Sequence, residues 1–190
     1  MNPSPTLGGA VLAGGTSRRM GRDKALIRVG DTTLVERAAS ALRAAGAEPV
    51  LIIGGDAAPL EAFGLEPVPD RWPGEGPLGG IVTALHSVPT DVVVILSCDL
   101  TDASAIAVRT VVGALGTSDV AVPVVEGRPQ WLHAAWRRQT ALPVLEDAFA
   151  NGERAPRSAA GRLRVTRLLD GDPCWFHDAD RPDDLPDGAR

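Results

Sequence analysis

Short, wholly apolar runs separated by amphipathic stretches are the feature that most constrains the fold of this chain. Residues 92–96 and 50–53 contain no polar side chain and are rich in β-branched residues. Such runs are typical of strands that are buried on both faces. Residues 9–13 form an earlier run of the same kind. The pattern therefore predicts central, parallel strands.

Helix-like stretches alternate with these runs. Residues 32–45 place their apolar side chains on one side, with Thr32 or Thr33 as the capping residue and Gly46 as the terminator. Further helices are expected at about 78–86, 106–115 and 141–150, and further strands at 120–125, 131–136 and, at a sheet edge, 163–169. This order predicts an α/β fold of three layers, a Rossmann-like, mostly parallel sheet with helices on both faces.

The bulk composition restricts the class of protein. With 190 residues, 44% of them hydrophobic, the chain can bury one sizeable core, so we expect one domain over residues 1–190. The net charge of −5 and the scattered basic residues lack the basic stripe of a nucleic-acid binder. We expect a small-molecule ligand and no nucleic-acid partner.

The apolar runs and the cysteines indicate the cellular compartment. No apolar run approaches the roughly 20 residues that span a bilayer, and no charged-then-apolar leader is present. Cys98 and Cys174 are the only cysteines and form no CxxC or Cys/His metal spacing. These features predict a cytoplasmic protein with no membrane partner and no need of a disulfide.

The segment 12–24, Leu-Ala-Gly-Gly-Thr-Ser-Arg-Arg-Met-Gly-Arg-Asp-Lys, directly follows the first predicted strand. Its glycines allow close approach of the backbone to a ligand, and its basic residues supply mobile positive charge. Neither GxxxxGK[ST] nor GxGxxG fits the spacing. A solvated turn is the alternative, but the position after a buried strand favours binding of a triphosphate.

This segment resembles the signature loop of nucleotidyltransferases that act on GTP or CTP, above all the molybdenum cofactor guanylyltransferases. The resemblance implies the fold of the nucleotide-diphospho-sugar transferases and transfer of GMP from GTP to the phosphate of molybdopterin, with release of pyrophosphate. It also implies that Lys24 and Arg19 bind phosphate groups and act in catalysis. The nucleotide-binding backbone would be that of Leu12, Ala13, Gly14 and Gly15.

Asp99 follows the buried run 92–96, at the end of that strand. Mg²⁺ prefers one or two carboxylates together with phosphate oxygens and water. Asp99 could instead cap the next helix, although Thr101 or Asp102 can take that role. In the resembled family a Cys-Asp pair stands here and the Asp holds Mg²⁺, so Asp99 is expected to be both a catalytic and a nucleotide-binding residue.

Two other acidic positions gain a role from the same resemblance. Asp70 stands ahead of a Gly-Pro-Leu helix start and is implied to contact the nucleoside, with Gly79 and Gly80 letting the ligand sit close. Asp178 and Asp180 stand where the family's closing segment has asparagines. They either reach the metal or a second Mg²⁺, or cap the last helix.

The residues that would bind the pterin acceptor are less clearly indicated by the sequence. Trp131 lies in a stretch that resembles the acceptor region, where it either stacks on a pterin or packs in the core. Arg154 and Arg157 match a region whose arginines could bind the pterin's phosphate or lie in a solvated loop. His86, His133 and His177 show no metal spacing and are expected to be packing or surface residues.

Gly54-Gly55 replace an Asn that the family uses for the guanine ring, so the choice of base stays open. The alternatives to GMP transfer are a CTP-using molybdopterin cytidylyltransferase or another NTP transferase of this fold. A third is a non-catalytic nucleotide-binding module that delivers molybdopterin to a partner. The implied substrates are GTP and molybdopterin, and the implied protein partners are molybdenum-cofactor biosynthesis proteins or recipient apoenzymes.

Overall fold

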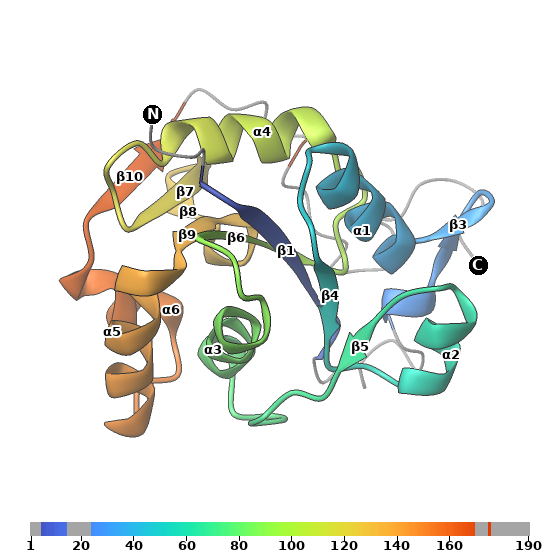
Figure 1. Cartoon of the computed structure of the whole chain (residues 1–190), viewed down its shortest axis with the longest axis horizontal. Helices are drawn as coiled ribbons and strands as arrows, with labels where there is room; N and C mark the ends of the chain where they lie inside the picture. The colour runs from blue at the N-terminus through green and yellow to red at the C-terminus, as the bar shows by residue number, and fades with distance from the viewer. Residues whose placement is uncertain (1–4, 15–23, 170–174, 176–190) are drawn as a thin grey trace.

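The computed structural model describes residues 5–14, 24–169 and 175. A mixed sheet runs through its centre in the order β10-β7-β9-β6-β1-β4-β5, with β8 paired to β7 (Figure 1). The strands are β1 (Leu7–Leu12), β4 (Val50–Ile53), β5 (Pro67–Val68), β6 (Val92–Ser97), β7 (Val120–Val125), β8 (Arg128–Pro129), β9 (Ala135–Arg137) and β10 (Val165–Leu168). Only β9 and β8 run against the common direction.

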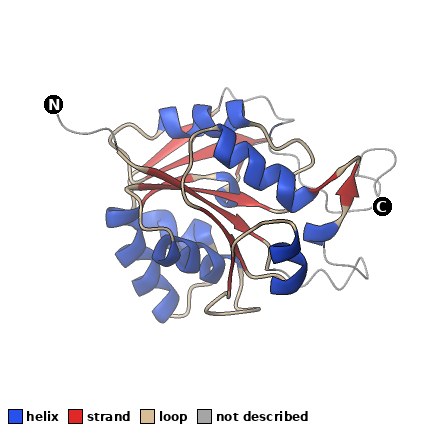
Figure 2. Cartoon of the chain, turned by 45° about the vertical axis from the view of Figure 1, so that its right-hand side comes forward, coloured by secondary structure: helices blue, strands red, loops and turns tan. Residues whose placement is uncertain are grey.

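Helices cover both faces of this sheet, as Figure 2 shows, so the predicted three-layer α/β fold is confirmed. They are α1 (Leu34–Ala44), α2 (Ala57–Ala62), α3 (Pro77–Ser87), α4 (Ala105–Ala114), α5 (Arg138–Ala150) and α6 (Pro156–Ala159). Short 3₁₀ turns are η2 (Lys24–Leu26), η3 (Trp131–His133) and η4 (Ala160–Arg162). A separate hairpin joins β2 (Arg28–Val29) to β3 (Thr32–Thr33).

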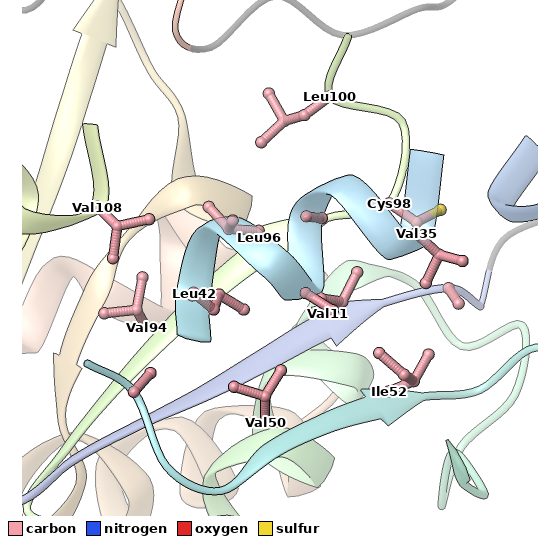
Figure 3. Close-up of a cluster of buried hydrophobic side chains, with 14 of the residues drawn as sticks. Val11, Val35, Leu42, Val50, Ile52, Val94, Leu96, Cys98, Leu100 and Val108 are labelled. Atoms are coloured by element: carbon pink, nitrogen blue, oxygen red, sulfur yellow. The ribbon is translucent and has the colours of Figure 1, made fainter. Parts of the chain in front are cut away.

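Alternate residues of the central strands feed two different cores. Val11, Ile52 and Val94 point to the side of α1 and α4, where Figure 3 shows them packed with Val35 and Leu42. Their strand neighbours pack on the other side against α3 and α5. Because successive side chains of a strand point to opposite faces, wholly apolar strands are what two covered faces require.

The predicted helix at 32–45 is confirmed with Thr33 as its cap. The Thr33 hydroxyl accepts a hydrogen bond from the Glu36 amide, and the Glu36 carboxylate accepts one from the Thr33 amide at 2.7 Å. This reciprocal capping box fixes the start of α1. The helix ends at Ala44, and Gly46 follows with a φ of +95°.

Other expectations need correction. Residues 131–136 do not form the single strand that was expected. The first half is η3, in which the His133 amide donates a hydrogen bond to the Gln130 carbonyl at 2.9 Å, and β9 begins only at Ala135. The helix expected from 141 begins at Arg138. Ser104 caps α4 in place of Thr101 or Asp102. The patterns of α2 and the β2–β3 hairpin are too short to have shown in the sequence.

The common strand direction positions the site. The carboxyl ends of β1, β4, β5 and β6 lie side by side at one edge of the sheet, since these strands are parallel neighbours. In parallel sheets this edge carries the ligand crevice. No helix in the described part of the chain is long and apolar enough to cross a membrane.

Candidate active site

A cavity of about 670 Å³ opens at the carboxyl ends of these four strands. Its walls come from the strand ends, the Pro- and Gly-rich segment after β5, and the start of α3. The lining residues are Leu12, Gly14, Ile53, Gly54, Gly55, Pro69, Asp70, Pro73, Gly74, Gly76, Pro77, Gly80, Ser97 and Leu132. Most are glycine, proline or aliphatic, so polar recognition by side chains falls to Asp70 and Ser97.

Asp99 and Lys24 meet beside this cavity. The Lys24 ammonium donates to Asp99 Oδ2 at 3.4 Å, and the two side chains are 16% and 17% exposed. Ser97 lines the cavity, and its hydroxyl donates to Asp99 Oδ1 in a short hydrogen bond. The pair joins residues 75 positions apart, and its low exposure limits the solvent screening of both charges.

Asp70 is held in the cavity wall by hydrogen bonds from the middle of α3 and from the segment before it. Its Oδ1 accepts from the Thr83 hydroxyl at 2.9 Å and from the Trp72 amide at 3.1 Å. Its Oδ2 faces Gly14: a Cβ built on that glycine would lie 3.8 Å from it. Gly14 after β1 and Asp70 after β5 thus lie close together in the cavity wall.

The residues fit a metal that is shared with a phosphorylated ligand. In the described ranges no three His, Cys, Asp or Glu side chains gather into a group that could hold a metal alone. Asp99 offers one carboxylate with a hydroxyl beside it. A single carboxylate completed by phosphate oxygens and water is the donor set that Mg²⁺ accepts.

Comparison with known proteins decides the family. The family described as "MobA-like NTP transferase domain" matches residues 9–166, which include every strand from β4 to β9, the first half of β10 and the cavity wall. The chain belongs to this family. It is therefore a nucleotidyltransferase by family, and its sheet and helices are those expected of a MobA-like transferase.

The names of two relatives agree with this MobA-like assignment, and one solved structure shares the fold. A "Probable molybdenum cofactor guanylyltransferase" of Methanothermobacter thermautotrophicus is 30% identical over 190 residues, covering 93% of this chain and 95% of the relative. One of Opitutus terrae is 51% identical over 81 residues, a match that spans only 43% of this chain and 40% of that relative. The crystal structure of molybdopterin-guanine dinucleotide biosynthesis protein A from Archaeoglobus fulgidus superposes with a TM-score of 0.76 at 23% identity, covering 94% and 95% of the two chains.

Not all residues singled out in the MobA-like signature loop line the cavity. Leu12 and Gly14 do, whereas the Ala13 side chain packs in the core and its amide donates to the Ile53 carbonyl at 2.9 Å. Gly15 and Arg19 lie outside the described residues, as do Asp178 and Asp180. The charged residues of the predicted site that the structure describes, Lys24, Asp70 and Asp99, come to one edge of the sheet.

Of the two adjacent glycines in α3, one lines the cavity and the other allows close packing of the helix. Gly80 lines the cavity, in keeping with the close approach of a ligand. A Cβ on Gly79 would instead lie 3.3 Å from the Trp72 Cβ and 3.4 Å from the Phe149 ring. The small size of Gly79 therefore serves packing of α3 against Trp72 and Phe149.

Two arginines expected near the acceptor are separated by the fold. Arg154 forms an ion pair with Glu75 at 2.8 Å, and its guanidinium carbon lies 4.1 Å from the Phe149 ring centroid. These contacts hold the segment before α3 in place. Arg157 lines a second cavity of about 450 Å³ with Trp131 and Arg167. Trp131 and its neighbour Leu132, both in η3, line the second and the first cavity respectively.

The described histidines are packing or surface residues. Burial lowers the pKa of His133 to about 3, so its imidazole is neutral at physiological pH. His86 pairs with Glu146 between α3 and α5. His177 lies outside the described residues.

Of two further residues that bear on this site, Lys24 was expected from the sequence and Thr83 was not. Lys24 is the only lysine of the chain, beside 18 arginines. A lysine ammonium binds phosphate as a compact point charge, whereas an arginine guanidinium binds phosphate or carboxylate through two parallel hydrogen bonds. Thr83, which the sequence did not reveal, donates its hydroxyl to Asp70 and so joins the middle of α3 to the segment after β5.

Proposed function

We propose that this protein transfers the GMP part of GTP to the terminal phosphate of molybdopterin and releases pyrophosphate. The observation that carries the proposal is the meeting of Lys24 and Asp99 beside a cavity walled by Gly14 and Asp70. Cation, carboxylate and glycine backbone are what a nucleoside triphosphate with its metal requires. The names borne by the relatives supply the guanine base and the pterin acceptor.

The reaction is an in-line displacement. An oxygen of the acceptor phosphate bonds to the α-phosphorus of GTP while the bond from that phosphorus to the α,β-bridging oxygen breaks. Pyrophosphate leaves with the bridging oxygen. The acceptor phosphate is already ionised, so no general base is required.

Catalysis then depends on positioning and on neutralising charge. Lys24 lies beside Asp99, and its flexible stem lets the ammonium turn to a triphosphate oxygen. Asp99 would hold Mg²⁺, which when bound supplies positive charge to the phosphate oxygens. Arg19 is proposed as a further phosphate contact, and Asp178 and Asp180 as further carboxylates near the metal.

The second cavity suits the acceptor. Arg157 and Arg167 line it, and within the described residues neither side chain makes a hydrogen bond or an ion pair. Most other walls are apolar, and Trp131 offers an aromatic surface. Two unpaired guanidinium groups beside an aromatic ring match an anionic, planar ligand such as a phosphorylated pterin.

Product analysis tests the proposal. The full chain is mixed with GTP, Mg²⁺ and molybdopterin, and pyrophosphate and the guanine dinucleotide are quantified together. Equal amounts of both support GMP transfer. Binding of GTP without either product would replace the proposal by a non-catalytic module that delivers molybdopterin in the cytoplasm to recipient apoenzymes.

Base choice needs its own measurement, because Gly54 and Gly55 present no side chains to a base. Calorimetric titration with GTP, CTP, ATP and UTP, each with Mg²⁺, ranks the four nucleotides. Tightest binding of GTP supports guanylyl transfer. Tightest binding of CTP would assign the protein to cytidylyl transfer instead.

A further inference from the structure

The two oxygens of Asp70 have different surroundings. Oδ1 accepts both of the hydrogen bonds that this carboxylate receives within the described residues, from Thr83 and from the Trp72 amide. Oδ2 receives none there and faces Gly14 in the cavity wall. One oxygen is thus anchored inward while the other is left for a ligand.

Thr83 is the inward anchor. Its side chain is fully buried in α3, and its hydroxyl accepts a hydrogen bond from the Arg71 amide at 3.2 Å. The single hydroxyl proton has two acceptors in reach, Asp70 Oδ1 at 2.9 Å and the Gly79 carbonyl at 3.0 Å. The carboxylate is the stronger acceptor because it is charged, and the Gly79 carbonyl already accepts a backbone hydrogen bond within the helix. The hydroxyl proton is therefore directed to Asp70.

We propose that Thr83 is a positioning residue for nucleotide binding: it holds Asp70 so that Oδ2 points into the cavity. This inference rests on the proposed function, since it takes the cavity to be the nucleotide site. A carboxylate oxygen can only accept hydrogen bonds. Its partner on the nucleotide is therefore a donor, either a ribose hydroxyl or the exocyclic amino group of guanine.

The first experiment compares Thr83→Val with Thr83→Ser by calorimetric titration of Mg-GTP. Valine keeps the shape and removes the hydroxyl, whereas serine keeps the hydroxyl. We expect Thr83→Val to weaken GTP binding about tenfold, the scale of one hydrogen bond to a charged group, and Thr83→Ser to stay within about twofold. Thermal melts of the same samples report stability separately.

A double-mutant cycle shows whether Thr83 acts through Asp70. In an Asp70→Ala background, Thr83→Val should change GTP affinity by less than about twofold, because residues that act through one contact are not additive. A full tenfold loss in that background would overturn the proposal. If Thr83→Val does not fold, Thr83→Cys takes its place in the cycle, since a thiol is a weak donor and acceptor.

Nucleotide analogues identify the donor. Titrations with 2′-deoxy-GTP, 3′-deoxy-GTP and ITP remove one hydroxyl or the amino group at a time. The analogue that lacks the donor should bind the parent protein about tenfold more weakly than GTP, and this gap should close in Thr83→Val. If all three bind like GTP, the contact to Asp70 is rejected.

The outcomes separate this inference from the proposed function. If the parent protein binds no nucleoside triphosphate, the proposed function fails and the inference fails with it. If the parent binds GTP and Thr83→Val binds it equally well with a lowered melting temperature, Thr83 is only structural. In that case the proposed function stands and the inference alone is overturned.

Discussion

Gly54 faces Gly14 across the cavity wall so closely that a Cβ on Gly54 would lie 2.9 Å from the Gly14 Cα and 3.0 Å from its nitrogen. Gly54 also has a φ of +76°, a conformation that other residues rarely adopt. Two loops that follow neighbouring strands therefore touch through their backbones alone. The close contact and the positive φ together favour glycine at position 54.

Gly54→Ala is expected to displace the loop that carries Gly14. Because a shift of about 1 Å at a reacting centre can cost about a hundredfold, kcat/KM for GTP should fall at least about tenfold. Gly64→Ala is the matched control, since Gly64 has a φ of +68° but a Cβ added there would meet nothing within 4 Å. Both variants should lose about 1–3 kcal/mol of stability, and comparable activity of the two would contradict the role of the contact.

Lys24→Ala should lower turnover at saturating substrates by at least about two powers of ten, the scale for removing one charge contact to the transition state. Pyrophosphate release measures this rate, and a rate within about threefold of the parent would reject the role. Because Lys24 is the only lysine, amine labelling followed by mass spectrometry provides a second readout. Mg-GTP should protect Lys24 from the label while the N-terminal amine reacts as before.

Asp99→Asn should raise the Mg²⁺ concentration needed for half-maximal GTP binding by about tenfold or more, because a neutral amide is a weaker ligand for a hard cation. Titrations of GTP at several Mg²⁺ concentrations check this shift. Asp102→Asn, three residues further along the same segment, is the control and should leave the Mg²⁺ dependence unchanged. An unaltered Mg²⁺ requirement in Asp99→Asn would place the metal elsewhere.

Arg167→Ala is expected to raise the KM for molybdopterin about tenfold, the scale of a lost charged contact, and to leave GTP affinity unchanged. Arg157→Ala should behave in the same way, since both side chains line the second cavity. Arg162→Ala serves as control because that guanidinium is already paired with Asp147 at 2.5 Å. Initial rates at varied molybdopterin and fixed GTP separate the effects, and an unchanged KM in both cavity variants would move the acceptor elsewhere.

Asp119 ties β7 to β10 and α5. Hydrogen bonds from Arg164 hold the pKa of Asp119 well below its ordinary value, with help from the Thr140 hydroxyl at 2.8 Å. Since the pKa is lowered on folding, this contribution to stability is present above about pH 4, the ordinary aspartate pKa, and is lost as the pH falls below it.

Asp119→Asn should therefore lose about 1–2 kcal/mol at pH 7, a figure kept low because the Arg164 side chain is 66% exposed. Its stability should also fall less steeply below pH 4 than that of the parent. Asp147→Asn, which breaks an exposed pair, should cost less than about 1 kcal/mol. Denaturant unfolding at pH 7 and pH 3 measures both, and equal losses would contradict the role of the buried carboxylate.

The positions of individual helices and strands could be predicted from the sequence, but the pairing of the strands in the sheet could not. Apolar β-branched runs, a threonine cap and a terminating glycine are local signals, so β4, β6, β7 and α1 appear where the pattern places them. The prediction of one strand over residues 131–136 was wrong because alternation of large side chains is also compatible with a 3₁₀ turn. Here the turn packs through Trp131 and Trp136, whose ring centroids lie 6.1 Å apart. Nor could periodicity reveal that β9 inserts antiparallel between β6 and β7.

By itself the sequence determined the layers, the glycine loop and the types of residue at the site, because each of these depends on residues close together in the chain. Only the tertiary structure decided that Lys24 meets Asp99 and that Thr83 turns Asp70 toward Gly14. Such pairs form when parallel strands bring their carboxyl ends to one edge. The order of those strands is fixed by packing over the whole sheet, and no local pattern records it.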